Sequence, residues 1–573
     1  MCKGKSTRTS SLVAWGLLTV AALTVFLSYL GSYSTLGSHE VLAAVPAREM
    51  LHDGDWIVPR YGGVLRVHKP PLVYWLVAVS GWLFGEFDEF AVRFPSAIAA
   101  LMLVALMSLW AARWYGRQAA FGAAVVQSTS LWAVNFGRHV EIDMVMCLLT
   151  TAAMFLIANQ PSNEEASHSR VRWIGILTLI GLTWLAKFQY GATMVFGPVF
   201  VFWILQGQWR KWQHFVNPLG LLIVIACMVI WPWFLLRECP VALERWRFET
   251  IGRAVGELGY DPWWFFCPEL LLFSMPWLFH VLLAAPQSWL RAWKHRDERE
   301  RFLWIWLIVD VWVISLSPSK HTNYLLAAMP VMTLLACQTF ARNLARIHRD
   351  ALRVSPFATR VLVIAAMAVV ITIGAVAPAK WPAVQVGLRC ASAVSACGLF
   401  GFWWCWQGHR RALAGWVSLA SALGVILITL STVTPQLDRR RNTAEFAKQL
   451  RQEVLNDMPV WVYARKGAHS GFHPSIFYLN DPVYQVNTFS ELLQQVRQSG
   501  ELLAVVECES LPRFPAIAPF VELHELARMP TQPGSREPPL VCVRLTDRSD
   551  AGEHMANSAV EISKTTNPSP LPH

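Results

Sequence analysis

The chain has 573 residues, of which 54% are hydrophobic and only 15% are charged, and it contains 29 Trp. Apolar runs of near-spanning length recur between residues 12 and 430, which excludes a soluble globular protein and predicts a polytopic α-helical membrane protein. The net charge of +11 does not indicate nucleic-acid binding, because most of the excess lies in short loops between apolar runs, as the positive-inside bias predicts.

The N-terminal part of the chain predicts one membrane span followed by a long polar loop. The segment MCKGKSTRTS is basic and is therefore expected in the cytoplasm. The first apolar run, 12–30, is followed by many others, so we interpret it as a retained span and not as a cleaved signal peptide. The run at 71–84 is shorter than the roughly 20 residues that a crossing helix needs. It is expected to form a juxtamembrane or re-entrant helix.

About 13 spans are expected in total, and the charges of the loops support this count. The loops assigned to the cytoplasm are basic or mixed, and counting 71–84 as a span would move most of them outside. The predicted spans are 11–32, 92–112, 118–136, 144–159, 173–187, 190–206, 216–236, 264–286, 302–316, 321–338, 361–377, 384–406 and 412–433. The first loop, 33–91, and everything after about residue 435 then lie outside the cytoplasm.

The C-terminal part has a different composition from the rest. After a membrane domain at 1–435, the segment 440–545 alternates helical patterns (TAEFAKQLRQEVL, FSELLQQVRQS) with short apolar runs (VWVYA, LLAVVE, LVCVRL), which predicts a small α/β domain. Residues 546–573 are rich in Ser, Asn, Thr and Pro and are expected to be disordered. The 11 Cys show no metal-binding spacing, and a disulfide between Cys508 and Cys542 is left open.

Two carboxylates outside the cytoplasm are candidate catalytic groups. Glu40 follows the first span, where an acid is a general base, a metal ligand or a hydrated interfacial residue. Asp143 begins an apolar helix, so it either faces a cavity or a partner, or is an N-terminal carboxylate favoured by the helix dipole. Arg138, His139 and Glu141 are nearby candidates for such a partner.

Four cations are predicted to face the same compartment as the two acids. Lys69 precedes two prolines that restrict the chain, and a lysine fixed at the membrane surface suits a phosphate head group. Lys187 ends an apolar run, Lys320 lies in SPSKHTNY between two spans, and Arg253 lies in the loop RFETIGRAVGELGY. Each alone is equally compatible with an interfacial anchor. Together with the acids they indicate an anionic lipid head group bound near an acid-lined cleft.

Several motifs resemble those of bacterial glycosyltransferases of the GT-C superfamily, related to protein O-mannosyltransferases and especially to the lipid A aminoarabinose transferases. The resemblance begins in the first loop with AREMLHDGDWIVPRYGG, HKPPLVYWLVAVSGWLFG and AVRFPSA. It continues through GRHVEIDM, LTWLAK, WPWF, SMPW and SPSKHTNYLLAAMP, and it covers about 430 residues.

The resemblance implies a 13-span GT-C fold, an extracytoplasmic C-terminal domain and a polyprenyl-phosphate sugar donor. It implies that the first-loop acid and Asp143 line the active site and that Lys69 contacts the donor phosphate, assisted by Arg253 and Lys320. The supporting residues predicted around this site are His39, His68, Arg138 and Lys187.

The sequence also departs from the family pattern. Relatives have an acid where this chain has His39, so the catalytic role passes to Glu40. An acid associated with a metal in the aminoarabinose enzyme is His68 here, which leaves a divalent metal in doubt and no cofactor certain. A glycine that follows the lysine of the family's sixth loop is Phe188.

The sequence therefore predicts an integral-membrane glycosyltransferase. It is expected to move a sugar from a polyprenyl phosphate to a lipid A-like lipid, a glycan or a protein at the periplasmic face of a bacterial inner membrane. The alternatives are a lipid or glycolipid transporter and a non-catalytic assembly partner. Transporters often contain inverted repeats and helices broken at the bilayer midplane, and the sequence shows neither.

Overall fold

The computed structural model describes residues 3–161, 165–248, 252, 259–341, 364, 367–368, 370–372, 374–376, 384–407, 410–438, 441–453, 459–463, 474–479, 482–514, 518–530 and 539–548. The chain divides into two compact units. A helical unit comprises Met1–Ser34, Pro46–Pro59 and Arg66–Leu437, and a C-terminal unit comprises Thr35–Val45, Arg60–Leu65 and Asp438–His573. This differs from the predicted division, which placed the whole first loop with the membrane domain.

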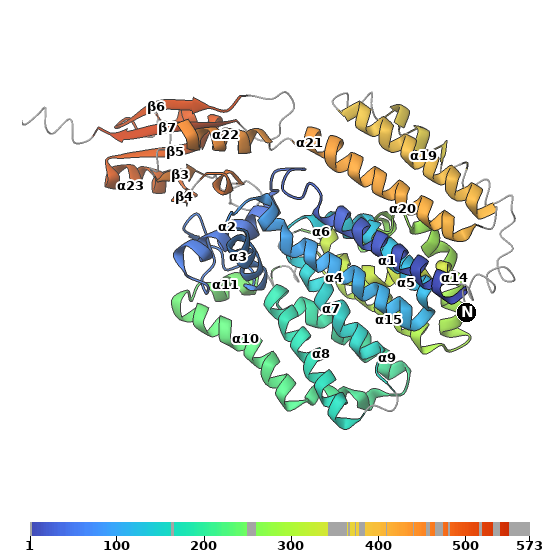
Figure 1. Ribbon diagram of the computed structural model, residues 1–573. Coiled ribbons are helices and arrows are strands. Elements are labelled where there is room, and N and C mark those ends of the chain that lie inside the picture. The colour runs from blue at the N-terminus through green and yellow to red at the C-terminus, as the bar shows by residue number, and fades with distance from the viewer. Residues whose placement is uncertain are drawn as a thin grey trace, which may run out of the picture. The chain divides into compact units, whose positions relative to one another are not determined.

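The helical unit is built almost entirely from helices (Figure 1). Its N-terminal half contains α1 (Lys3–Leu27), α2 (Ser38–Asp53, divided between the units at Pro46), α3 (Leu72–Phe84), α4 (Glu89–Tyr115), α5 (Arg117–Thr129), α6 (Leu131–Arg138), α7 (Ile142–Ala158), α8 (Ala166–Lys187), α9 (Gln189–Leu205) and η1 (Trp209–Val216). The rest contains α10 (Pro218–Glu238), α11 (Ala242–Arg247), α13 (Phe266–Phe273), α14 (Leu278–Trp293), α15 (Glu298–Ser315), η3 (Thr322–Ala327), α16 (Met329–Cys337), η4 (Gln338–Phe340), α19 (Gln385–Gln407), α20 (Arg411–Ile428), η6 (Thr429–Val433) and α21 (Thr434–Leu437).

Every predicted span except 361–377 overlaps one or more of these helices, and 361–377 lies mostly outside the described residues. Among the described residues, four helices are long and apolar enough to cross a membrane on their own, namely Glu89–Tyr115, Pro218–Glu238, Gln385–Cys405 and Leu413–Leu437. Other apolar helices are shorter. The short helix predicted at 71–84 is present as α3, with 13 residues.

Besides the span at 321–338, which is divided between the 3-10 helix η3 and α16, two predicted spans are not single continuous helices. The span at 118–136 is interrupted at Ser130, which lies in an extended conformation between α5 and α6. The span at 264–286 is divided between α13 and α14, whose axes differ by 110°. Pro276 lies in the break, where the missing N–H and the clash of the ring with the preceding turn favour a bend or an end of the helix. The prediction of one uninterrupted helix was therefore wrong at both places.

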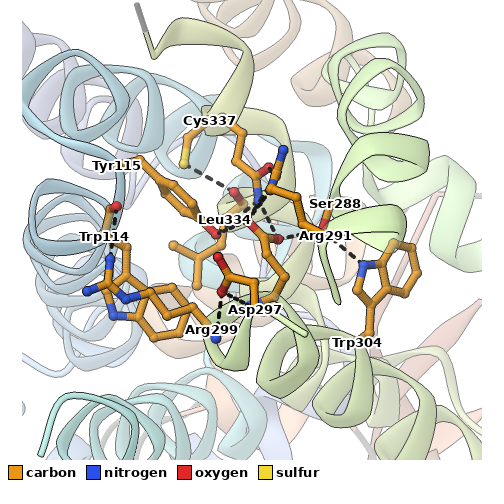
Figure 2. Close-up of polar contacts among 11 residues, drawn as sticks. Trp114, Tyr115, Ser288, Arg291, Asp297, Arg299, Trp304, Leu334 and Cys337 are labelled. Carbon is orange, nitrogen blue, oxygen red and sulfur yellow. Dashed lines mark hydrogen bonds and ion pairs between the residues drawn. The ribbon is translucent and has the colours of Figure 1, made fainter. Parts of the chain in front are cut away.

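A buried polar network joins α4, α14, α15 and η4 (Figure 2). The Arg291 guanidinium donates to the Glu300 carboxylate at 2.8 Å, and only 2% of the Glu300 side chain is exposed. Ser288 Oγ donates to the other Glu300 oxygen at 2.5 Å, and Tyr115 OH donates to the first at 3.2 Å. Gln338 bonds to Arg291, Glu300 and Tyr115. A buried carboxylate is tolerated here because it is both paired and hydrogen-bonded.

The C-terminal unit contains a five-stranded sheet of order β4-β3-β5-β7-β6. Strands β4 (Val483–Val486), β3 (Val460–Tyr463) and β5 (Glu501–Glu507) are parallel, whereas β7 (Leu540–Asp547) is antiparallel to β5 and to β6 (Val521–Arg528). The other elements are α22 (Arg441–Glu453), η7 (Pro474–Phe477), α23 (Phe489–Ser499), η8 (Cys508–Arg513) and the hairpin of β1 (Arg60–Tyr61) with β2 (Val64–Leu65). The small C-terminal α/β fold predicted from alternating patterns is present.

The core of this sheet contains the cysteines for which a disulfide was left open. Cys508 and Cys542 are both free thiols. Burial raises the pKa of Cys542 to about 11, so this thiol stays protonated and unreactive near neutral pH. The predicted disordered tail lies outside the described residues from residue 549 onward.

We predict that Glu300→Gln lowers the stability of the helical unit. The substitution keeps the shape of the side chain but leaves the Arg291 charge without its carboxylate, which costs about 3–5 kcal/mol for a buried pair. The midpoint of thermal unfolding in detergent is the measurement. Glu298→Gln is the matched control, because Glu298 lies two residues earlier in the same helix and is exposed. Equal midpoints for the two variants would contradict the assigned role of the network.

Candidate functional site

One end of the helical unit brings together two of the predicted site residues, Asp143 and Lys187. Asp143 lies in the first turn of α7, and Lys187 is the last residue of α8. A helix carries partial positive charge at its N-terminus and partial negative charge at its C-terminus, so each side chain has the charge that its own helix end favours. The two readings left open for Asp143 both hold, because it has a helix-dipole position and a partner.

The two charged groups form a short, buried ion pair. Lys187 Nζ lies 2.5 Å from Asp143 Oδ1, and the side chains are only 11% and 4% exposed. Asp143 Oδ2 accepts a hydrogen bond from the Asn323 amide at 2.7 Å. Both carboxylate oxygens are therefore held, one by a cation from α8 and one by a neutral donor from η3.

Two tyrosines complete the surroundings of Lys187. Its ammonium lies 4.8 Å from the ring centroid of Tyr190 and 4.4 Å from that of Tyr324, within the range of cation–π attraction. The Tyr190 hydroxyl donates to the Tyr324 carbonyl at 2.5 Å, which ties α9 to η3. Since Lys187 is compensated by a carboxylate and two ring faces, it serves better to orient Asp143 than to bind a further anion.

Lys320, the predicted phosphate ligand, is held in a different way. It lies just before η3, is 6% exposed, and its Nζ donates to the carbonyls of Ser317 at 2.6 Å and Asp261 at 3.1 Å. Its backbone N–H donates to the Asp261 carboxylate at 2.8 Å. Among the described residues, the ammonium contacts these carbonyl oxygens and no carboxylate within salt-bridge distance. It precedes Asn323, the partner of Asp143, by three residues.

Lys69 and His68 occupy the turn before α3 and are both half-buried. The central part of the first loop is tied to the helical unit by tryptophan indoles. Trp231 Nε1 donates to the Ile57 carbonyl at 3.0 Å, and Trp246 Nε1 donates to the Val67 carbonyl at 2.7 Å. Lys69 thus lies on a fixed segment, as a ligand of the donor phosphate would, and this role stays a prediction.

Glu40 and His39 belong to the C-terminal unit. Glu40 is only 2% exposed and lies in the first turn of α2, where its Oε2 accepts from the Gly37 N–H at 2.8 Å. This contact satisfies a free N–H at the helix start, as the acid of a capping box does. His39 is exposed. Like Asp143, Glu40 is thus an acid at a helix N-terminus, where negative charge is favoured.

Arg138 has structural contacts. It is 1% exposed, and its guanidinium donates to the carbonyls of Val25 and Ser28 near the end of α1, the latter at 2.5 Å. It also lies over the Tyr33 ring at 4.9 Å. These contacts anchor α6 to α1, and a supporting role in catalysis stays a prediction. Arg253, the third predicted phosphate ligand, lies outside the described residues.

Sequence reasoning missed three residues of the cluster: Asn323, Tyr190 and Tyr324. Asn323 and Tyr324 belong to the motif SPSKHTNYLLAAMP that supported the resemblance. Their closeness in sequence to Lys320 was the one signal that could have identified them. A neutral amide is a common loop residue, and its importance here comes from its contact with a carboxylate 180 residues away.

Phe188, the departure from the family glycine, adopts a backbone conformation that favours glycine. Its φ is +49°, and it connects α8 directly to α9. The ring packs edge-on against Trp184 and Trp246, with centroid distances of 5.3 and 5.5 Å. Aromatic packing therefore holds a strained backbone next to Lys187. Strain of this kind persists where the surrounding structure fixes it.

The described residues contain no group of three His, Cys, Asp or Glu side chains that could hold a metal ion. Both oxygens of Asp143 already accept from nitrogen donors. Metal dependence stays a prediction.

Comparisons with known proteins agree with the predicted resemblance. Residues 68–233 match the family described as dolichyl-phosphate-mannose-protein mannosyltransferase. The undecaprenyl phosphate-alpha-4-amino-4-deoxy-L-arabinose arabinosyl transferase 2 of Sodalis glossinidius is 28% identical over 330 residues, which are 56% of this chain and 58% of that protein. The corresponding transferase of Edwardsiella ictaluri is 27% identical over 410 residues, 68% of this chain and 71% of that protein. The chain thus spans little more than half of the Sodalis relative.

Solved structures extend the similarity to nearly the whole chain. The crystal structure of ArnT from Cupriavidus metallidurans bound to undecaprenyl phosphate has a TM-score of 0.72 and 20% identity, and the match covers 92% of this chain and 98% of that one. The apo form gives a TM-score of 0.73. These matches establish the fold and confirm the resemblance to the aminoarabinose-transferase group. The chain is a multi-pass membrane protein with this fold.

We predict that Phe188→Gly is more stable than Phe188→Ala. Both variants lose the ring, but only alanine keeps a Cβ at positive φ, so the difference should be about 1–3 kcal/mol in favour of glycine. Thermal unfolding of the two purified variants in detergent is the measurement. If the alanine variant is as stable as the glycine variant, the connection between α8 and α9 is not strained.

Proposed function

We propose that the chain is an integral-membrane glycosyltransferase that moves a sugar from a polyprenyl-phosphate donor to an acceptor of the cell envelope. The observation that carries the proposal is the Asp143 cluster, in which a buried carboxylate is oriented by Lys187 and by Asn323, three residues after Lys320. The named activity of the relatives supports the same reaction class.

The reaction is displacement at the anomeric carbon of the donor sugar. The bond from that carbon to the lipid phosphate breaks, and the bond to the acceptor oxygen or nitrogen forms. Negative charge grows on the departing phosphate, and fixed cations stabilise charge where it develops. Lys320 has an ammonium suited to this task, with Lys69 and Arg253 as further ligands.

Asp143 orients the acceptor and, when the acceptor is a hydroxyl, takes its proton. Its two carboxylate oxygens are fixed by the ion pair with Lys187 and by the hydrogen bond from Asn323, so the group has one defined orientation. Glu40 is the second acid, and it shares the helix N-terminal position. The separate effects of Asp143→Asn and Glu40→Gln on turnover show which of the two acids acts as the base.

The site faces the periplasm in this proposal, with the N-terminus in the cytoplasm and the C-terminal domain in the periplasm. The basic loops between spans support this orientation. The acceptor is a lipid A-like lipid, a glycan or a protein. No nucleotide is needed, because the lipid phosphate already activates the sugar. Loss of transfer activity on addition of EDTA would show that a divalent metal is required.

Transfer of label from a polyprenyl-phosphate sugar to an acceptor, measured in detergent with envelope fractions, tests the function. A transferase yields labelled acceptor and free polyprenyl phosphate. A transporter would leave the sugar on its lipid in detergent, and an assembly partner would leave the donor unchanged. Analysis of envelope lipids and proteins from a deletion strain then identifies the molecule that loses its sugar.

We predict that Asp143→Asn and Glu40→Gln each lower turnover by about 10²–10⁴-fold, the range for general base catalysis, while the protein remains folded. Lys69→Ala is expected to raise the donor concentration needed for half-maximal rate. Glu86→Gln is the control, since Glu86 is an exposed acid of the same first loop. Full activity in all three site variants would end the assignment.

A further inference from the structure

The C-terminal unit binds the start of the first loop, about 400 residues away in sequence. Thr35 donates to the Asp438 carboxylate from both its backbone N–H and its hydroxyl, at 2.5 and 2.7 Å. The Leu36 N–H donates to the Tyr478 hydroxyl at 2.7 Å. These groups are buried, with 8% of Thr35 and 1% of Leu36 exposed. The contacts hold Thr35–Val45 as part of the C-terminal unit.

The same unit binds a second piece of the loop along the edge of its sheet. The hairpin of β1 and β2 lies against β4, the edge strand, where the Gln485 N–H donates to the Gly62 carbonyl at 2.8 Å. Tyr61 in this hairpin is fully buried. An exposed edge strand has unpaired backbone groups, and the hairpin satisfies one of them.

Gly62 is required by this contact. Its φ is +56°, and a Cβ at this position would lie 3.0 Å from Gln485 N and 3.2 Å from Ile476 Cδ1. Gly54, in the same loop, also has a positive φ, +73°, but a Cβ there would meet no atom within 4 Å. The two glycines share a backbone requirement, and only one of them approaches the sheet.

The two bound segments carry or adjoin residues of the proposed site. Glu40 lies within Thr35–Val45, and Lys69 follows the hairpin by four residues. We propose that the C-terminal domain is a positioning module for the first loop, whose task is to fix Glu40. The catalytic part of this inference rests on the proposed function, whereas the holding of the loop rests on the contacts alone.

The physical reason is the cost of ordering a long loop. Each fixed backbone residue loses about 1–2 kcal/mol of conformational entropy, so the irregular stretches that join α2, the hairpin and α3 stay mobile unless other contacts compensate. A misplacement of about 1 Å at a reacting group can lower a rate about 100-fold. A folded domain that binds the loop at two places prevents this misplacement without supplying a reacting group itself.

The test compares Gly62→Ala with Gly54→Ala in the full-length protein. Both variants place a Cβ at positive φ, but only Gly62→Ala disrupts the contact with β4. We expect Gly62→Ala to speed amide hydrogen exchange in 35–45 and 60–65 and to lower kcat about 10–100-fold. Gly54→Ala should leave both exchange in those segments and kcat within about twofold of the parent, because nothing packs against its added methyl group.

A second pair of variants covers the case in which Gly62→Ala does not fold. Thr35→Val removes the hydroxyl donor to Asp438, whereas Thr35→Ser keeps it. Faster exchange and lower kcat in the valine variant, with both restored in the serine variant, support the proposal. Faster exchange with parental kcat would overturn it, as would unchanged exchange. If the parent protein transfers no sugar, the proposed function fails, and the exchange result still decides whether the domain holds the loop.

Discussion

The ion pair of Asp143 and Lys187 is the interaction on which the candidate site depends. A carboxylate at the edge of an apolar bundle is costly unless it is paired and hydrogen-bonded. Here the lysine at the end of α8 supplies the charge, and Asn323 in η3 supplies a further hydrogen bond. The start of α7, the end of α8 and η3, which are distant in sequence, must therefore meet at one place. Phe188 directs the chain from α8 into α9 at that point, at the expense of a strained backbone.

The buried polar clusters around Glu300 and near η3 have different characters. Glu300 lies in the first turn of α15, and η3 follows the other end of that helix, which has 18 residues and so is about 27 Å long. Around Glu300, every oxygen is matched by protein donors, as expected for a structural network. Near η3, the partners of the Lys320 ammonium among the described residues are neutral carbonyls. Charge without a matching charge is what a site for an anionic lipid needs.

The helical fold could be predicted from the sequence because the length of an apolar run is a local property. Interruptions were harder to predict, since Ser130 and Pro276 break helices inside runs that remain apolar. The strands β3, β5 and β7 were visible as apolar runs, whereas β6 was missed because its residues, VELHELAR, are those of a polar edge strand. β4, with the residues VYQV, was also missed.

The site was predictable as a set of charges and not as a set of contacts. Asp143, Lys187 and Lys320 were marked by charge beside apolar runs. No sequence pattern shows that Asp143 pairs with Lys187 whereas the Lys320 ammonium binds backbone carbonyls. The position of Glu40 in the C-terminal unit was also beyond sequence reasoning. It depends on Thr35 meeting Asp438 across 403 positions, a contact that only the folded chain creates.

The central claim is that the acids and cations of the site face one compartment, outside the cytoplasm. Labelling of single cysteines with a membrane-impermeant reagent in intact cells tests it most directly, in a chain whose native cysteines are replaced. The account predicts that His39→Cys, Lys69→Cys and His139→Cys react from the outer side of the membrane. Arg210→Cys and His295→Cys should react only after the membrane is opened. Reaction of residues 39, 69 and 139 from different sides would contradict the account, because no single reaction centre would then exist.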